Sequence, residues 1–552
     1  MTTRTADALL AVLLAAFVAL GLDGLDRVPN IHVDEGWQAA PGWGLFTEGR
    51  FATGLFGGFF GGERHYYGFM PLSPILIGAS MRCFGFGLFQ ARLVPLALAS
   101  AVLLLTYLLG RRLLGAPRGL LAALLLATWP VAAPTLHLTT GVPLQDLARI
   151  ARYDIAVPVF GLLALLALAA RSDGDGPPPV GRYLLAGAFC GLATLSHIYG
   201  AAFLIACLAL YPRAGWRRAV AALGGYLVTL TPWLVFVASG LGDYLSQNKS
   251  FAPRYAIGSP SFYLSNLVHE VRRYGLVAGA AHRGVLVAWL FVAAIVAGGL
   301  LLARNRGPRA RFLLVPTAVV AGLFALLLEP KNPMYLASLW PLFALLAAVA
   351  FGSLLERRGP ARFAALLLLG AGALHGVWRD ADLVRRVGVA TPYPRLAARL
   401  AAVVPPGVTL LGPTNYWLAL APHVRAYRAM NVPMAHALPE FADAPVPFAR
   451  AADAVEADFV LIDEALTRFL DEPPGHGDPH AALAAEMTAW LSQRTVPAAR
   501  LEDPSYGVFR LYRVRSVRAL ASASSTETRS RQWTSPRAHT ALMQAPQGRS
   551  SL

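Results

Sequence analysis

Apolar runs of helical length recur through the first 378 residues, and they constrain the fold more than any other feature. They cover 8–22, 88–110, 119–137, 154–170, 219–240, 284–303, 312–328, 335–354 and 363–378. A helix needs about 20 apolar residues to cross a bilayer, or fewer where neighbouring helices or local thinning help. The run 183–212 is too long for one span and is interrupted by polar residues, so it predicts a tight pair, 183–196 and 198–212. We therefore expect a polytopic α-helical membrane protein with about eleven spans.

The low share of charged residues and their placement support a membrane protein. Only 14% of the residues are charged, whereas about a quarter are charged in soluble domains. The arginines gather between the apolar runs, in the clusters Arg111, Arg112 and Arg118; Arg171 and Arg182; Arg213, Arg217 and Arg218; Arg304, Arg306, Arg309 and Arg311; and Arg357, Arg358 and Arg362. Such turns are typical of the cytoplasmic side of a multi-pass protein, and a nucleic-acid partner is not expected, because basic residues do not cluster with aromatics on a polar domain. Arginine in place of lysine, with abundant Ala and Gly, is typical of a GC-rich bacterial genome, and we expect the multi-pass chain in the bacterial cytoplasmic (inner) membrane.

One apolar stretch, 71–86, decides the topology. As a twelfth span it would place the later arginine clusters on different sides of the membrane, against the positive-inside rule. As a helix lying on the membrane surface, it leaves all five clusters in the cytoplasm. We therefore expect the N-terminus inside and the loop 23–87 on the outer face, together with 138–153, 241–283 and 329–335.

The chain divides into three predicted parts. Residues 1–378 form the transmembrane module. In 379–515 the periodicity changes: 408–412, 458–463 and 507–514 read as strands, and 394–404 and 480–493 as helices. This part is expected to be a small α/β extracytoplasmic domain. Residues 516–552 are rich in Ser, Arg, Thr and Ala and are predicted to be a disordered tail.

Acidic residues at the outer face are the first candidates for chemistry. Asp34 and Glu35 follow the first span, and a carboxylate next to hydrocarbon is costly unless it has a partner or a function. The structural alternative for Asp34 is a cap on a helix that starts at Glu35. Asp154 stands in ARIARYD with Arg149 and Arg152, and its structural alternative is again a helix cap with flanking arginines.

Lys331 is the next candidate. It lies in EPKNPMY, a short predicted outer loop that ends at Tyr335, and it is one of only two lysines among 48 basic residues. A lysine ammonium suits a phosphate oxygen. The alternative is a lysine at a helix end whose ammonium reaches the membrane interface.

Together these motifs resemble the GT-C glycosyltransferases, in particular the protein O-mannosyltransferase and aminoarabinose transferase branch, families 39 and 83. The resemblance covers about residues 8–354 and includes the surface helix, Ala-Arg-Leu-x-Pro and Arg-Arg-Leu within 69–115. It implies a glycosyltransferase that moves a sugar from a polyprenyl-phosphate donor, embedded in membrane lipid, to an extracytoplasmic acceptor that is a lipid, a glycan or a protein.

The resemblance also implies roles for the candidates. Asp34 is the general base, Glu35 shapes its environment, and Asp154 positions the acceptor or a neighbouring cation. The residues that would hold the donor phosphate are Arg152, Lys331, Tyr335 and His197, although a packed histidine is the favoured reading of the last. The loop 242–275 would cover the cavity, and the 379–515 domain would help to select the acceptor.

The sequence departs from the family at two places. Before the surface helix it reads HYYGFMPLSP, with His65 or Glu63 in place of the usual charged residue, and SHIY brings His197 where many relatives have a lysine. A divalent metal stays open as a cofactor, with Asp34, Glu35, Asp154 and His65, or Glu63, as candidate ligands, but no ligand spacing demands one. The alternative function is a multi-pass transporter or flippase, which would favour ionisable groups in mid-span and an internal repeat.

Overall fold

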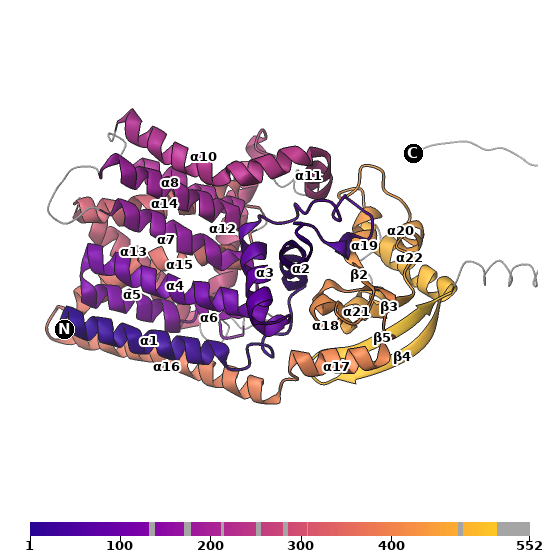
Figure 1. Ribbon diagram of the computed structural model, residues 1–552. Coiled ribbons are helices and arrows are strands. Elements are labelled where there is room, and N and C mark those ends of the chain that lie inside the picture. The colour runs from indigo at the N-terminus through magenta and orange to yellow at the C-terminus, as the bar shows by residue number, and fades with distance from the viewer. Residues whose placement is uncertain are drawn as a thin grey trace, which may run out of the picture.

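The computed structural model describes residues 1–131, 139–169, 178–210, 215–249, 256–279, 285–305, 307–329, 331–472 and 478–515. Helices dominate as far as residue 403, and a small five-stranded sheet follows. The helices stack side by side at one end of the molecule, and the sheet lies at the other end (Figure 1). The predicted tail, 516–552, lies outside the described residues.

Every predicted span contains a helix. These helices are α1 (Thr3–Leu22), α4 (Leu88–Leu114), α5 (Ala116–Thr128), α7 (Ala156–Leu168), α8 (Val180–Ser196), α9 (Ala201–Leu210), α10 (Trp216–Ser239), α13 (Val285–Arg304), α14 (Pro308–Leu327), α15 (Trp340–Leu355) and α16 (Pro360–Val389). Among the described residues, five helices are long and apolar enough to cross a membrane by themselves, so the count of eleven spans stays a prediction.

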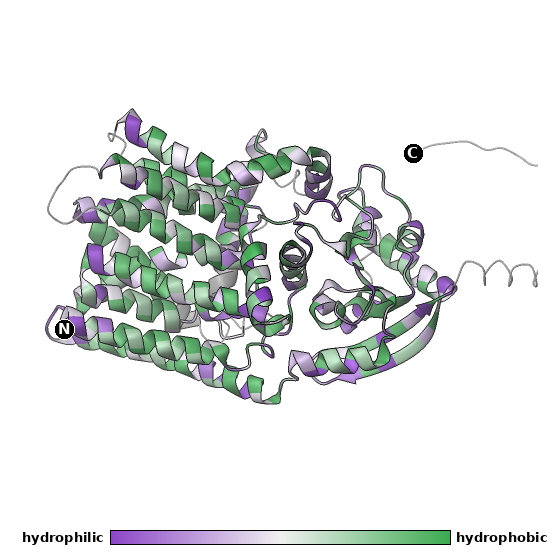
Figure 2. Cartoon of the chain, in the orientation of Figure 1, coloured by the Kyte–Doolittle hydropathy of each residue, from purple (hydrophilic) through white to green (hydrophobic). Residues whose placement is uncertain are grey.

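The outer surface of this bundle is apolar. Large side chains such as Trp216, Val228 and Leu374 are more than 70% exposed, and the helical part is predominantly hydrophobic in Figure 2. A soluble monomer rarely exposes so large an apolar surface, because the cost in water is high. The molecule is a multi-pass membrane protein.

Several arginine-rich turns meet at one end of the bundle. Arg118, at the start of α5, donates to both carboxylate oxygens of Glu356 at 2.8 Å, which joins the α4–α5 turn to the α15–α16 turn. The N-terminus lies at this end, opposite the sheet (Figure 1). The arginine-rich turns that the structure describes therefore gather at one end of the bundle, as the positive-inside rule predicts for a multi-pass protein.

Short elements fill the space between the bundle and the sheet. They are α2 (Val33–Glu48), η1 (Gly54–Phe56), α3 (Leu72–Phe84), α6 (Pro143–Leu147), η2 (Tyr153–Ile155), η3 (Ile198–Gly200), α11 (Leu241–Asn248), α12 (Pro260–Gly279) and η5 (Pro333–Ser338). Helix α3 confirms the helix expected in 71–86, and its 13 residues extend about 20 Å. It packs tightly on α2, because a Cβ at Gly42 would come within 1.9 Å of the Pro74 carbonyl oxygen.

The C-terminal part is an α/β domain built on one mixed sheet. Its strands are β1 (Thr409–Gly412), β2 (Ala426–Ala429), β3 (Phe459–Ile462), β4 (Thr495–Asp503) and β5 (Gly507–Val514), in the order β2-β1-β3-β5-β4. The first three are parallel, and β5 and β4 are antiparallel additions. The accompanying helices are α17 (Tyr393–Val403), η6 (Thr414–Tyr416), α18 (Trp417–Leu420), α19 (Asn431–His436), α20 (Phe448–Ala454), α21 (Glu464–Asp471) and α22 (Pro479–Arg494).

The three predicted strands and two predicted helices of this domain are confirmed, but β2 and β4 are missing from the prediction. Strand β2 has only four residues, and β4 is an edge strand with a proline and alternating exposed positions, so neither forms an apolar run.

Candidate active site

Helix α2 begins with a cap that leaves Asp34 free for other contacts. His32 is the N-cap residue: its Nδ1 accepts from the Asp34 backbone N at 3.1 Å, and its own N–H donates to Glu35 Oε2 at 2.7 Å. The structural alternative for Asp34, a cap on a helix starting at Glu35, is therefore wrong. The Asp34 carboxylate stands in the first turn of α2 and is 20% exposed.

Arg152 holds two of the predicted carboxylates together. Its Nη1 donates to Asp34 Oδ2, and its Nε donates to Asp154 Oδ2 at 2.8 Å. Asp154 lies in η2 and caps no helix, so the cap alternative is wrong for it as well. Its second oxygen, Oδ1, is buried without a partner. Asp34 Oδ1 likewise has no hydrogen-bond partner within the described ranges, and because Asp34 is partly exposed whereas Asp154 is buried, Asp34 is the carboxylate with an oxygen open to a ligand.

Glu35 does not face a cavity. It is completely buried and accepts two hydrogen bonds of 2.7 Å from the guanidinium of Arg92 on α4. The backbone N–H groups of Ala151 and His32 also donate to it. Burial by itself would raise the pKa of Glu35, but the charge and hydrogen bonds of Arg92, together with the two backbone N–H groups, lower it below its usual value. Glu35 thus joins α2 to α4 and to the segment before Arg152, and it acts as a positioning residue.

Arg149 fixes the other end of the same segment. All of its bonds go to backbone carbonyls around the end of α1, namely those of Leu20, Gly21, Asp23, Gly24 and Val28, at 2.7–3.0 Å. A cation at a helix C-terminus satisfies carbonyls that have no partner within the helix. Arg149 is therefore structural, and Arg152, three residues later, is the arginine that reaches the carboxylates.

Asp34 opens into a cavity of about 360 Å³, which we call the aromatic cavity. Its lining comes from the outer loop, α11 and the sheet domain: Asp34, Trp37, Phe56, Phe60, Tyr66, Gly68, Phe69, Ser246, Gln247, Asn431, Val432, Ala435 and Phe441. Trp37 and Tyr66 stack with ring centroids 6.5 Å apart. Aromatic faces beside a carboxylate and amides suit a ligand with both C–H faces and hydroxyl groups, as a sugar has.

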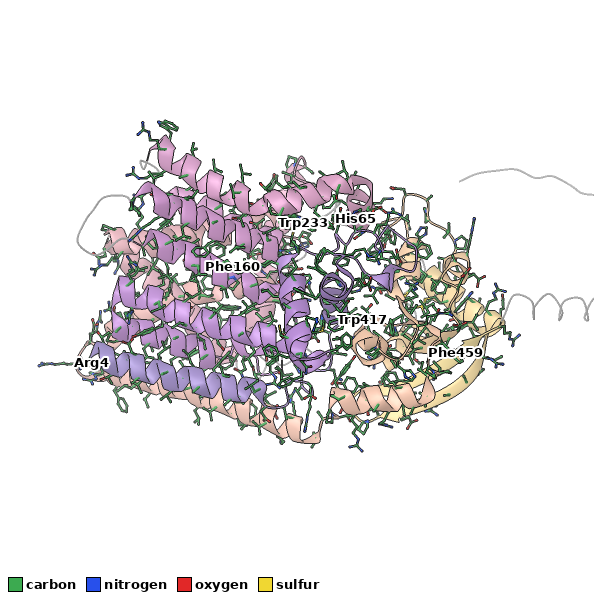
Figure 3. All side chains as sticks on the ribbon, in the orientation of Figure 1. Arg4, His65, Phe160, Trp233, Trp417 and Phe459 are labelled. Carbon is green, nitrogen blue, oxygen red and sulfur yellow. The ribbon has the colours of Figure 1, made fainter. Side chains whose placement is uncertain are left out.

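A second cavity, of about 730 Å³, adjoins the first and shares Gly68, Phe69 and Ser246 with it. We call it the tyrosine cavity, after five of its lining residues, Tyr67, Tyr153, Tyr199, Tyr244 and Tyr335. Figure 3 labels His65 and Trp233 at this junction between the bundle and the sheet domain. Arg152 connects the two cavities, because it binds Asp34 of one and lies 5.1 Å from the ring of Tyr153 of the other.

His197 and Tyr335 both line the tyrosine cavity. The His197 ring stacks on Tyr153 with centroids 4.5 Å apart, and its Nδ1 accepts from the Tyr199 backbone N. Burial lowers the pKa of His197 to about 4, so the ring is neutral at physiological pH. It can contact a phosphate only as a neutral ring, in keeping with the packed histidine favoured from the sequence.

Lys331, the lysine expected to hold the phosphate, lies away from both cavities, and Lys249 lies in one of them. Lys331 turns back onto α14, where its Nζ donates to the carbonyls of Phe324 and Ala325 at 2.7 and 2.9 Å, and it lies 3.1 Å from Glu270 Oε2. It lines neither cavity. Lys249, at the end of α11, lines the tyrosine cavity and forms a 2.7 Å ion pair with Asp443 of the sheet domain. Among the lining residues that the structure describes, Lys249 is the one permanent cation.

The candidate metal ligands do not come together. Glu63 accepts from the Gly58 N–H at 2.6 Å, and His65 Nδ1 lies 3.0 Å from Asp243 Oδ2. Asp34 and Asp154 already share Arg152. In the part of the chain that the structure describes, no group of three or more His, Cys, Asp or Glu residues could hold a metal ion. The residues present do not fit a metal centre.

Helix α11, within the predicted covering loop 242–275, lines both cavities. It is tied to the outer loop by Gln247, which receives the Tyr67 N–H and donates to the carbonyls of Phe60 and His65. The ionisable residues that line the two cavities thus lie where the bundle meets the sheet domain, which disfavours the transporter alternative.

Comparisons with known proteins agree with this architecture. The model of glycosyltransferase family 87 matches residues 74–330. The structure of ArnT from Cupriavidus metallidurans in the apo state superposes with a TM-score of 0.57 and 15% identity over 92% of this chain and 98% of that one. The same protein bound to undecaprenyl phosphate gives 0.56 and 15%, over 91% and 97%. No curated protein sequence matches. The GT-C fold is confirmed, although the matching family model is 87 and not 39 or 83.

Proposed function

We propose that this chain, a membrane protein with the GT-C glycosyltransferase fold, moves a sugar from a polyprenyl-phosphate donor to a hydroxyl group of an acceptor. The observation that carries the proposal is Asp34, whose unoccupied carboxylate oxygen stands in the aromatic cavity beside the larger tyrosine cavity. The similarity to ArnT bound to undecaprenyl phosphate supports the class of donor. Asp34 and the cation Lys249 line different cavities, so the base and the leaving phosphate can stand on opposite sides of the sugar.

In the proposed reaction, Asp34 Oδ1 takes the proton of the acceptor hydroxyl. The acceptor oxygen attacks C1 of the sugar, and the bond from C1 to the phosphate oxygen breaks, so polyprenyl phosphate leaves with the bonding electrons. Arg152 fixes the Asp34 carboxylate through Oδ2, and Asp154 in turn fixes Arg152. A positioned general base typically contributes 10²–10⁴-fold to the rate.

The leaving phosphate needs positive and hydrogen-bonding partners on the other side of the sugar. Lys249 and the hydroxyl groups of Tyr153 and Tyr335 line the tyrosine cavity and supply them. Lys249 would exchange its partner Asp443 for the phosphate, because that aspartate is 89% exposed and easily solvated.

The two lysines provide a matched test of this assignment. We expect Lys249→Ala to raise the donor KM tenfold or more, since a hydrogen bond to a charged group contributes about 1.5–3 kcal/mol. Lys331→Ala should keep the wild-type donor KM and lower the unfolding temperature, because α14 and Glu270 lose a partner. Steady-state kinetics with a labelled polyprenyl-phosphate sugar give the answer. A raised donor KM in Lys331→Ala alone would contradict the assignment and restore Lys331 to the phosphate.

The reaction is proposed to occur on the extracytoplasmic face of a bacterial inner membrane. The arginine-rich turns and the sheet domain lie at opposite ends of the bundle, and the positive-inside rule assigns the turns to the cytoplasm. Reporters inserted after residues 175 and 450 should therefore report opposite sides of the membrane, with the second outside. Two reporters on the same side would contradict the topology.

A further inference from the structure

A third cavity lies in the sheet domain, and the proposed reaction does not use it. It measures about 260 Å³ and follows the carboxyl ends of the three parallel strands. Its lining is Val33, Pro413, Thr414, Asn415, Met430, Asn431, Met434, Asp463, Ala465, Leu466 and Phe469. We call it the edge crevice. Residues 413–415 follow β1 directly, 430 and 431 follow β2, and 463 follows β3.

This position is one where α/β domains bind ligands. In the order β2-β1-β3 the second and third strands lie on opposite sides of β1, and ligands bind outside the carboxyl ends of parallel strands at such a switch point. The side chains that follow the strands therefore converge on one spot. The volume is just below the usual range for small-molecule sites, roughly 300–1,000 Å³, so the crevice has room for about one sugar ring.

The lining indicates an uncharged, hydroxyl-rich ligand. None of its described residues is basic, which disfavours a phosphate or another anion. The Asp463 carboxylate is 7% exposed and accepts from the Leu466 N–H and the Tyr416 hydroxyl, so each oxygen keeps a lone pair. Asn431 Oδ1 receives the Thr414 hydroxyl at 3.0 Å, and its Nδ2 has no hydrogen-bond partner within the described ranges. Phe469 and two methionines supply an apolar side for sugar C–H groups.

The crevice adjoins the proposed reaction site. Asn431 lines both the edge crevice and the aromatic cavity, and Val33 of the crevice precedes Asp34 in the chain. The wall between them is tightly packed: a Cβ at Gly36 would lie 2.4 Å from the Thr414 carbonyl oxygen, and Asn415 Nδ2 donates to the Ile31 carbonyl at 3.0 Å. The crevice and the base therefore keep a constant separation.

We propose that the edge crevice is a distal acceptor subsite for an uncharged sugar unit, so that the acceptor of Asp34 is an oligosaccharide chain. This inference rests on the proposed function, which supplies the reaction at the near end. The reacting sugar of the acceptor occupies the aromatic cavity, and the next unit passes Asn431 into the crevice. A single monosaccharide would leave the crevice empty and bind weakly.

Direct binding without a donor tests the subsite separately from catalysis. Full-length protein in detergent is titrated with mannose, mannobiose and mannotriose, and ligand-observed NMR reports binding. We expect the di- and trisaccharide to bind at least tenfold more tightly than mannose. Ala465→Trp fills the crevice from an exposed position. It should abolish the higher affinity for the longer sugars while keeping the wild-type unfolding temperature. Ala485→Trp, an exposed change on α22 outside the crevice, is the matched control and should bind as the wild type does.

The outcomes separate the two proposals. The subsite would be overturned by equal affinity for all three sugars or by no binding of any of them. It would also be overturned if Ala465→Trp still bound the longer sugars more tightly than mannose. The subsite would also be overturned if the control Ala485→Trp lost the higher affinity for the longer sugars as well. If the wild type binds oligosaccharides with this pattern but transfers no sugar from any polyprenyl phosphate, the proposed function fails and the crevice remains a sugar site.

Discussion

Replacing Asp34 by asparagine is expected to lower kcat by about 10²–10⁴-fold, which is the usual contribution of a general base. The amide retains the size of the carboxylate and can still accept a hydrogen bond from Arg152, but it cannot take a proton from the acceptor hydroxyl. The donor KM should change little, because Asp34 lies in the aromatic cavity and the proposed phosphate contacts line the tyrosine cavity. Transfer of a labelled sugar under saturating donor measures the effect.

Glu48→Gln is the matched control for this experiment. It removes an acidic charge at the other end of the same helix, where Glu48 forms an exposed 3.0 Å pair with Arg50. Exposed pairs of this kind contribute little to stability, so the control should have wild-type activity and a wild-type unfolding temperature. A wild-type kcat in Asp34→Asn would remove Asp34 as the base.

Removing one partner of the Glu35–Arg92 pair is expected to destabilise the protein by about 3–5 kcal/mol, because the remaining buried charge has no counterion. Both side chains are fully buried, so solvent cannot replace the lost partner. Arg92→Ala also leaves the carbonyls of Leu25 and Pro29 without a donor. Unfolding in detergent, followed by circular dichroism over a denaturant titration, gives the change in free energy.

The double variant Glu35→Leu with Arg92→Met tests whether the two charges act together. It removes both charges at once, so its loss of unfolding free energy should be smaller than the sum of the losses in the two single variants. It should remain less stable than the wild type, because the Ala151 and His32 N–H groups still lose their acceptor. Strictly additive losses would contradict a coupled pair.

The helical framework could be predicted from the sequence because its cause is local. Twenty apolar residues indicate a span wherever they occur, and each of the eleven predicted segments contains a helix. The limits were harder to predict, since α16 continues to Val389, well past the apolar run that ends at 378, as a helix that leads into the sheet domain. Hydropathy reports where a helix becomes polar and not where its hydrogen bonds end.

The candidate site also contains residues that could be predicted from the sequence and residues that could not. Asp34, Arg152 and Asp154 could be predicted because charged residues beside apolar runs are costly, and the structure brings all three together. The choice between the lysines could not be made, because it depends on which backbone carbonyls are nearby: Lys331 follows the open end of α14, whereas Lys249 is directed by α11 and Asp443. Arg92 offered a signal, a cation inside an apolar run, that points to a buried partner.

The contacts of Arg149 have a consequence for biogenesis. The carbonyls that it binds around the end of α1 belong to residues synthesised more than 120 positions earlier. The first helix therefore enters the bilayer with this end still hydrated, and it gains its final cap only when the segment before α7 emerges from the ribosome. Because Arg152 follows three residues later, the same event delivers the guanidinium to Asp34. The cap of the first helix and the contact of Arg152 with Asp34 thus depend on the same short segment of the chain.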